Sequence, residues 1–373
     1  MLDLSDIPLV DNHCHGLLVD DSPMTVDVLR LRFQENAFAQ PFPPEHVATS
    51  VHYLWALRQM AEVLDCEPTE ESVIAARAAL SQAEIDRRYM ERAGIDWLLV
   101  DDGYPDPADT VDREEQARRT GCRIGWVERV ETVAGRLVGE STGFGDWDEQ
   151  LRADLMSARD RGVCSLKSVA AYRSGLAISE PDPADVAAAF TRLRASGSSR
   201  VQEKSLVDYV VRLAMQAARA QELPVQFHTG YGDADADLLL ANPLHLRGLL
   251  HEFPTVPVVM LHGAYPYTRK LGVLAATYPN AYVDVSYAIP FLNSRELRSV
   301  TREALACAPG ARVMYSSDGV GLADQYWLGA VRGRQAIGAA LHELVEAGDL
   351  DTDQALDTAA LVMHGNAERI YQL

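Results

Sequence analysis

The sequence predicts an α/β fold, a (β/α)8 barrel, and two observations support this prediction. Short apolar runs rich in β-branched residues alternate with segments whose apolar positions repeat at helical spacing, which is typical of parallel strands joined by crossover helices. Eight such runs occur in the 373 residues, the number of strands that closes such a barrel. The predicted strands span Leu9–His15, Ile95–Asp101, Arg123–Glu128, Val163–Ser168, Pro224–Thr229, Val256–His262, Ala281–Ser286 and Val313–Asp318.

The segment between the first two predicted strands, residues 16–94, is much longer than an ordinary connection. It carries several aromatic residues and then a mostly helical stretch, so we expect a helical insertion over the mouth of the barrel. There it would form a lid or a wall of the substrate pocket; the alternative is a packing or dimer element away from the pocket. Because residues 1–373 show no repeat and no low-complexity tract, we expect a single domain.

Composition and charge restrict the class of partner. With 47% hydrophobic and 24% charged residues, the chain has the composition of a globular protein. Its formal net charge of −20 disfavours binding to nucleic acid or to an anionic membrane, because both would repel such a surface. We therefore expect a small-molecule substrate. A homo-oligomer is compatible with the sequence, although no segment specifies one.

The cysteine residues and the lack of a long apolar segment indicate a cytoplasmic protein. No stretch approaches the roughly 18 uninterrupted apolar residues of a membrane span, and the N-terminus runs directly into the first strand. The cysteines form no C-x-x-C pair, so we expect reduced thiols rather than a disulfide framework. They lie at five scattered positions: Cys14, Cys66, Cys122, Cys164 and Cys307.

The most specific motif is Asp11-Asn12-His13-Cys14-His15, which ends the first predicted strand. Side chains alternate between the two faces of a strand, so His13 and His15 point the same way. Two neutral imidazoles held side by side bind zinc or a similar divalent ion. The motif alone is short, so the rest of the sequence has to support a metal site.

Barrel active sites lie at the carboxyl ends of the strands, and the predicted strand ends carry suitable side chains. Asp318 alone would be explained as a turn residue that caps the next helix. Lysine is a metal ligand only when carbon dioxide carbamylates it, and otherwise it is an ordinary cation for a substrate carboxylate. The strand-end residues are His13 and His15 on the first strand, Lys167 on the fourth, His228 on the fifth, His262 on the sixth and Asp318 on the eighth.

This order resembles the amidohydrolase superfamily of metal-dependent barrels, in which H-x-H on strand one is followed by Lys or Glu on strand four, His on strands five and six, and Asp on strand eight. The segments 166–176, 226–233 and 315–319 are similar to the amidohydrolase half of fungal and plant proteins that are fused to a glutamine-synthetase-like domain. The ending 364–371 is similar to the terminal helix of the amidohydrolase-related group.

The resemblance implies a metal centre and roles for its residues. His13, His15, His228 and Asp318 would hold one divalent ion, with zinc as the first choice and manganese, iron or nickel as alternatives. A carbamylated Lys167 would bridge to a second ion. His262 would either join that second ion or polarise the substrate and assist proton transfer. The number of ions, one or two, stays open.

The leading hypothesis is hydrolysis of the amide C–N bond of a small carboxylated substrate, such as a γ-glutamyl or N-acyl amino-acid compound. A divalent metal lowers the pKa of bound water from about 16 towards about 7, and Asp318 would act as the general base. Arg173 would clamp a substrate carboxylate, although many arginines only form surface salt bridges. Tyr172 and Tyr231 are the other candidates for substrate contact.

Two other functions remain open. Related barrels with a similar ligand set decarboxylate or isomerise small organic acids, so a metal-dependent decarboxylase or isomerase is the main alternative. A catalytically silent scaffold is the other, although it predicts missing ligands and none is missing.

Two smaller features have structural explanations. Asn366 lies near the start of the final helix, where its side chain would cap exposed N–H groups. Gly230, Gly232 and Gly263 follow the histidines and would permit turns or close backbone approach.

Overall fold

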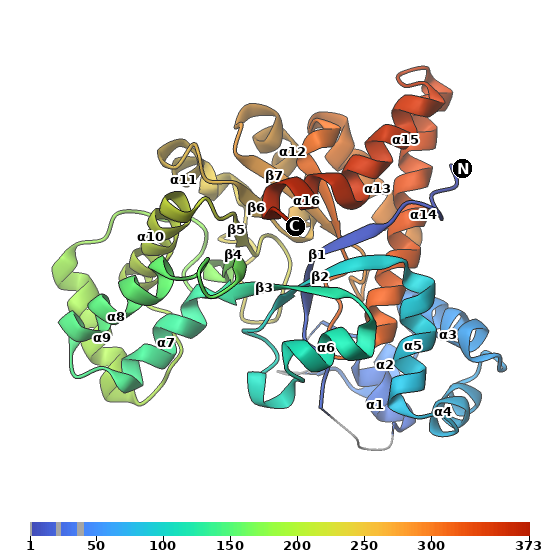
Figure 1. The fold of residues 1–373 in the computed structure, drawn as a ribbon, viewed down its shortest axis with the longest axis horizontal. Helices are drawn as coiled ribbons and strands as arrows, with labels where there is room; N and C mark the ends of the chain where they lie inside the picture. Colours follow the sequence, from blue (N-terminus) through green and yellow to red (C-terminus); the bar gives the residue numbers. More distant parts are fainter. Residues whose placement is uncertain (1, 20–23, 36–40) are drawn as a thin grey trace.

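The structure, a computed structural model, describes residues 2–19, 24–35 and 41–373. Eight parallel strands follow one another around a barrel in chain order (Figure 1). This arrangement confirms the predicted (β/α)8 architecture. The strands are β1 (Leu9–His15), β2 (Ile95–Asp101), β3 (Arg123–Arg129), β4 (Val163–Ser168), β5 (Val225–Phe227), β6 (Val258–Met260), β7 (Ala281–Ser286) and β8 (Val313–Ser316).

The barrel closes between β1 and the residues that directly follow β8. The backbone N–H of Asp318 donates to the carbonyl of His13 (3.0 Å), and the N–H of His15 donates to the carbonyl of Gly319 (2.9 Å). Consequently, the first and last strand ends, more than 300 residues apart in the sequence, lie side by side.

Three strands are shorter than the sequence predicts. His228, His262 and Asp318 lie one or two residues beyond the ends of β5, β6 and β8 rather than within them. His262 and Asp318 have left-handed backbone conformations, with φ of 65° and 58°. This conformation is incompatible with a strand and costs about 1–2 kcal/mol for a residue with a Cβ atom, and it recurs at functional sites.

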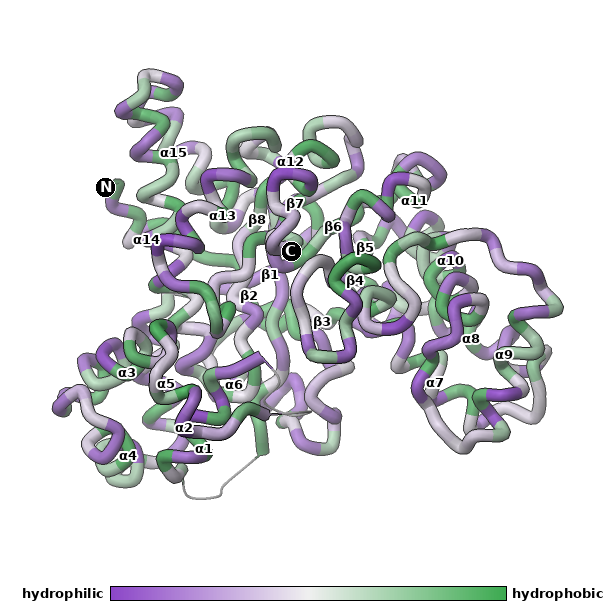
Figure 2. Tube along the Cα trace, turned by 180° about the vertical axis from the view of Figure 1, so that it is seen from behind, coloured by the Kyte–Doolittle hydropathy of each residue, from purple (hydrophilic) through white to green (hydrophobic). Residues whose placement is uncertain are grey.

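Helices connect the strands and cover the outside of the barrel. In the two opposite views of Figures 1 and 2, α7–α9 lie to one side of the strands and α3–α5 to the other. After the insertion, the helices are α6 (Arg113–Thr120), α7 (Val130–Glu140), α8 (Phe144–Met156), α9 (Pro183–Ser196), α10 (Lys204–Gln221), α11 (Arg247–Glu252), α12 (Thr268–Thr277), α13 (Ser294–Cys307), α14 (Ala323–Ala347), α15 (Thr352–Ala360) and α16 (Asn366–Tyr371).

The segment between β1 and β2 is helical, as the sequence predicts. Ser50, Thr69 and Ser81 begin α3, α4 and α5, and each side chain accepts a hydrogen bond from a backbone N–H of the first turn. The insertion packs on the barrel through α5, which lies against α14. Its helices are α1 (Val26–Leu31), α2 (Pro44–Val47), α3 (Val51–Leu64), α4 (Glu70–Ala78) and α5 (Gln82–Ala93).

The C-terminal helix follows directly from a five-residue π-helical segment, Leu361–Gly365. The expected capping role of Asn366 is wrong, because the helical backbone is already continuous at this residue. Its side-chain amide instead donates to the carbonyls of Gly310 and Val313, both at 2.8 Å. Asn366 therefore anchors α16 to the start of β8.

The structure bears on the predictions about the cysteines and about membrane spans. All five cysteines are free. None of the helices among the described residues is long and apolar enough to cross a membrane.

Candidate functional site

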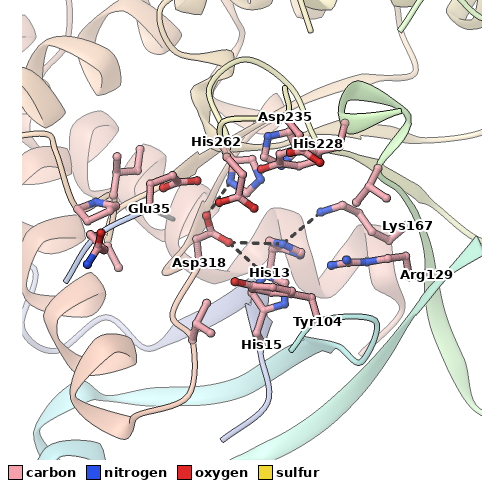
Figure 3. Close-up of a pocket in the computed structure, with 18 of the residues that line it drawn as sticks. His13, His15, Glu35, Tyr104, Arg129, Lys167, His228, Asp235, His262 and Asp318 are labelled. Atoms are coloured by element: carbon pink, nitrogen blue, oxygen red, sulfur yellow. Dashed lines mark hydrogen bonds and ion pairs between the residues drawn. The ribbon is translucent and has the colours of Figure 1, made fainter. Parts of the chain in front are cut away.

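A cavity of about 470 Å³ lies at the carboxyl ends of the strands (Figure 3). Its volume is within the range of small-molecule sites, which is roughly 300–1,000 Å³. The side chains that the sequence places at strand ends all line this cavity: His13, His15, Lys167, His228, His262 and Asp318.

His13, His15 and Asp318 form a group that could hold a metal ion, since one ligand atom from each lies within 4.8 Å of the others. The Nε2 atoms of both histidines lie 3.6 Å from Oδ1 of Asp318. Ligands bound tetrahedrally to zinc at about 2.0–2.1 Å lie about 3.4 Å from one another. The three residues therefore fit a divalent ion with little movement.

Hydrogen bonds at the other ring nitrogens orient both imidazoles. Nδ1 of His13 lies 2.9 Å from Oε1 of Gln226, and Nδ1 of His15 lies 3.4 Å from the carbonyl of Asp101. Because both acceptors are oxygens, each Nδ1 carries the proton and each Nε2 keeps its lone pair. Such outer partners fix the tautomer that a metal-binding histidine needs.

Burial controls the protonation of this group. It lowers the pKa of His13 well below its ordinary value, and the nearby charge of Lys167 acts in the same direction. His13 is therefore neutral at pH 7. Burial alone would raise the pKa of Asp318, but the interactions with His262, His15 and His13 outweigh it and hold the pKa well below its ordinary value. The set accordingly presents a carboxylate and a neutral imidazole.

Lys167 is almost fully buried beside this group. Its Nζ lies 3.2 Å from Nε2 of His13 and 3.9 Å from Oδ2 of Asp101. Burial lowers the pKa of Lys167 to about 8, even though Asp101 acts to raise it. A substantial fraction of this lysine is thus the neutral amine near pH 8, which is the form that carbon dioxide carbamylates.

The histidines after β5 and β6 take different positions. The rings of His228 and His262 lie 4.4 Å apart between centroids. Gly230 permits the loops after β5 and β6 to approach each other, because a Cβ atom there would lie 2.4 Å from the backbone of Ala264. Nδ1 of His262 lies 3.1 Å from Oδ2 of Asp318, whereas His228 donates from Nε2 to the carbonyl of Tyr231 at 2.5 Å. His228 would have to turn its ring to become a ligand, so that role stays a prediction.

Of the three residues with predicted substrate contacts, two line the cavity, Tyr172 and Arg173. Within the part of the chain that the structure describes, no carboxylate lies within ion-pair distance of Arg173, and its buried Nε has no hydrogen-bond partner. Tyr231 is not among the lining residues, but its hydroxyl lies 3.5 Å from Oδ2 of Asp318.

Sequence reasoning missed a pair at the ends of β2 and β3. Asp101 accepts two hydrogen bonds from Nε of Arg129, both at 3.2 Å, and one from Nη2 at 2.6 Å. In the sheet register, His15 pairs with Asp101 and Arg129 pairs with Lys167, so this ion pair belongs to the same ring of strand ends. A search of the predicted strand ends for charged pairs, as well as for metal ligands, would have found both residues.

The insertion also contributes residues that the sequence did not single out. Arg32, Gln34 and Glu35 line the cavity, and Figure 3 shows Glu35 on the side of Asp318. Burial raises the pKa of Glu35 well above its ordinary value, and the charges of Asp318 and Asp233 add to this effect. The insertion therefore forms part of the cavity wall, while its action as a lid stays a prediction.

Comparisons with known proteins agree with this geometry. A sequence profile of the amidohydrolase family matches residues 166–373, which is more than half of the chain. The protein fluG of Emericella nidulans is 30% identical over 98% of this chain. The aligned region is 46% of fluG, so the chain spans about half the length of this relative.

Solved structures show the same fold. A proposed metal-dependent hydrolase of Lactobacillus casei superimposes with a TM-score of 0.89 at 30% identity, covering 100% of this chain and 98% of the other. The uronate isomerase of Thermotoga maritima superimposes with a TM-score of 0.69 at 12% identity, over 98% and 95% of the two chains, and shares the fold alone. The profile match, the 30% identity to the Lactobacillus casei protein over nearly both whole chains and the strand-end residues together show that this chain belongs to the amidohydrolase superfamily.

Proposed function

We propose that the protein is a metal-dependent hydrolase that cleaves the amide C–N bond of a small carboxylated substrate. The observation that carries this proposal is a single cavity with two complementary parts. One part is the potential metal-binding group of His13, His15 and Asp318, and the other is the guanidinium of Arg173, which has no ion pair among the described residues.

The charge of the cavity supports an anionic substrate. The chain as a whole has 34 Lys and Arg against 54 Asp and Glu. A cavity richer in cations than the rest of the molecule concentrates anions locally. Five lining residues are cationic and four are acidic: Arg32, Arg129, Lys167, Arg173 and Arg200, against Glu35, Asp233, Asp235 and Asp318.

The contacts of Asp318 support a role in moving a proton during the reaction. Its Oδ1 faces the two Nε2 atoms, and its Oδ2 faces His262 and the hydroxyl of Tyr231. A water molecule adds its oxygen to the amide carbonyl carbon, and Asp318 accepts the proton. The same proton passes to the nitrogen as the C–N bond breaks, so the products are an amine and a carboxylic acid, which then releases the second proton of the water to solvent. A divalent metal, when bound, polarises the carbonyl and acidifies the water.

The remaining residues position the substrate. His262 holds Asp318 through Oδ2 and would assist proton transfer. Arg173 and Tyr172 would bind the substrate carboxylate, Arg173 through paired N–H groups. We propose γ-glutamyl or N-acyl amino-acid compounds as the substrate class. Zinc is the first choice because two imidazoles and a carboxylate suit it, with manganese, iron or nickel as alternatives. We expect one ion, with a second only if Lys167 is carbamylated.

The test combines metal analysis with a substrate panel. Wild type, His13→Ala and the control His251→Ala, which changes an exposed histidine away from the cavity, are purified without chelator. Metal content is measured by mass spectrometry, and amide cleavage is measured on γ-glutamyl and N-acyl amino acids. We expect metal and cleavage in the wild type and the control, and loss of both in His13→Ala.

Two results would contradict the proposal. If the wild-type protein contains no metal, the proposed metal centre is wrong. Stoichiometric metal without amide cleavage, but with release of carbon dioxide from organic acids or isomerisation of them, would replace the hydrolase with the decarboxylase or isomerase alternative.

A further inference from the structure

The C-terminal helix α16 packs on the end of the barrel at which β8 begins, with one face buried against the barrel interior and Arg369 exposed on the other face. The side chain of Tyr371, at the end of α16, is only 4% exposed. It belongs to a cluster of buried residues that come from the strands, from the residue after β6 and from α16: Val10, Leu99, Val127, Val259, Leu261, Tyr282, Met314, Ala367 and Ile370.

The hydroxyl of Tyr371 makes two hydrogen bonds in this interior. It donates to Oδ1 of Asn12 at 3.0 Å and accepts from Nε2 of Gln226 at 2.9 Å. Asn12 is itself held in place, because its Nδ2 donates to Oδ2 of Asp284 and to the carbonyl of Tyr315. The hydroxyl therefore binds to a fixed partner on one side and to Gln226 on the other.

Gln226 connects this hydroxyl to the metal-binding group. Its Nε2 has two hydrogens, and both have acceptors: the hydroxyl of Tyr371 and the carbonyl of Asn12, the latter at 2.7 Å. This leaves Oε1 to face His13, where it accepts from Nδ1 at 2.9 Å. All four residues are buried, so no water molecule replaces a lost bond without rearrangement.

We propose that Tyr371 is a positioning residue of the metal centre, acting through Gln226 on the tautomer and the orientation of His13; this proposal rests on the metal site proposed above. Without the hydroxyl, the Gln226 amide keeps only one of its two acceptors. The amide can then turn towards another acceptor for its unpaired N–H, which moves Oε1 away from Nδ1 of His13. Without this acceptor at Nδ1, the imidazole is free to turn and to carry its proton on Nε2, the atom that faces Asp318, and either change weakens it as a ligand.

The experiment compares metal binding by wild type, Tyr371→Phe and a control, Tyr315→Phe. The hydroxyl of Tyr315 is as deeply buried, but it makes no hydrogen bond to any residue that the structure describes. The apoproteins are titrated with Co²⁺, whose visible absorption reports its coordination. We expect Tyr371→Phe to bind Co²⁺ about tenfold more weakly with an altered spectrum, as is typical when an outer partner of a ligand is lost. Tyr315→Phe should bind as the wild type does.

A double-mutant cycle tests the connection through Gln226. If Tyr371 acts only through Gln226, then Gln226→Leu and the double variant Gln226→Leu/Tyr371→Phe should have the same Co²⁺ affinity. Thermal unfolding of each apoprotein shows whether a lower affinity reflects lost folding instead. A Tyr371→Phe affinity within twofold of the wild-type value, or additive effects in the cycle, would overturn the positioning role alone. A wild type that binds no Co²⁺ would overturn the metal site as well.

Discussion

Arg173 differs from the other arginines of the cavity wall in its electrostatic surroundings. Arg129 pairs with Asp101, and Arg200 pairs with Asp235. Arg173 has no such pair among the described residues, and burial lowers its pKa, with the charge of Arg200 acting in the same direction. A partly buried cation without a counter-ion destabilises the free protein, and a bound carboxylate would remove that cost.

Replacing Arg173 should therefore weaken substrate binding more than it affects the chemical step. A hydrogen bond to a charged group contributes about 1.5–3 kcal/mol, so Arg173→Met should raise KM for carboxylated substrates by about 10- to 100-fold and change kcat much less. The variant should also be at least as stable as the wild type. Steady-state kinetics and thermal unfolding measure the two effects.

The control for this substitution is Arg247→Met, since Arg247 is exposed and does not line the cavity. It should leave KM unchanged. An unchanged KM in Arg173→Met would exclude Arg173 from carboxylate binding. The same change in KM for substrates that lack the carboxylate would also contradict the role.

At the scale of elements, one polar cluster joins three helices of the insertion. Arg30 on α1 donates from Nε and Nη2 to the carboxylate of Glu70 on α4, both at 2.6 Å. Tyr53 on α3 donates to the same carboxylate at 2.7 Å. The hydrogen bonds from Arg30 and Tyr53 lower the pKa of Glu70 against the opposing effect of burial. This cluster holds α1, whose neighbouring residues line the cavity, against the rest of the insertion.

The cluster predicts a pH-dependent stability. Because the pKa of Glu70 is lower in the folded protein than in the unfolded chain, its contribution is complete above the ordinary pKa of about 4.5 and is lost as the pH falls through the folded value. Glu70→Gln should therefore reduce the free energy of unfolding by about 1–2 kcal/mol at pH 7. The difference from the wild type should shrink as the pH falls from 5 to 3.

Urea unfolding at several pH values measures this difference. Glu140→Gln is the control, because Glu140 is half exposed and pairs with Arg136 on the same helix. Its effect should stay within about 0.5 kcal/mol at every pH. A Glu70→Gln difference that does not vary with pH would show that charge does not contribute to the cluster.

At the scale of the whole molecule, a buried ion pair joins the insertion to the barrel. Nη1 of Arg77 on α4 lies 2.8 Å from Oδ2 of Asp324 in the first turn of α14, and their side chains are 3% and 0% exposed. The next residue, Gln325, lines the cavity. This ion pair therefore holds the insertion against α14, the helix that follows Asp318 in the chain.

Removing one member of this pair should be strongly destabilising. Arg77→Met leaves the carboxylate of Asp324 buried without its cation, which typically costs about 3–5 kcal/mol. The double variant Arg77→Met/Asp324→Leu should recover more than half of that loss. Denaturant unfolding measures both variants, with Arg118→Met, which breaks an exposed pair with Glu115, as the control. A double variant no more stable than Arg77→Met would contradict this account.

The sequence by itself determined the architecture and much of the candidate site. Each parallel strand needs a crossover, so the alternation of apolar runs with helical segments is typical of a parallel sheet, and the number of eight strands favours the barrel. The barrel in turn brings strand ends together, so local motifs alone could place His13, His15, Lys167, His262 and Asp318 around one cavity. The length of the segment between the first two strands was enough to predict an insertion.

Only the tertiary structure decided the contacts that join distant segments. The charges that act on Glu35 and the hydrogen-bond partners of Tyr371 lie more than a hundred residues away in the sequence, and no local pattern encodes which side chain faces them. The direction of the His228 ring likewise depends on a loop carbonyl rather than on its strand. The physical reason is that sequence periodicity specifies which face of an element is buried, whereas hydrogen-bond partners depend on register and packing between elements.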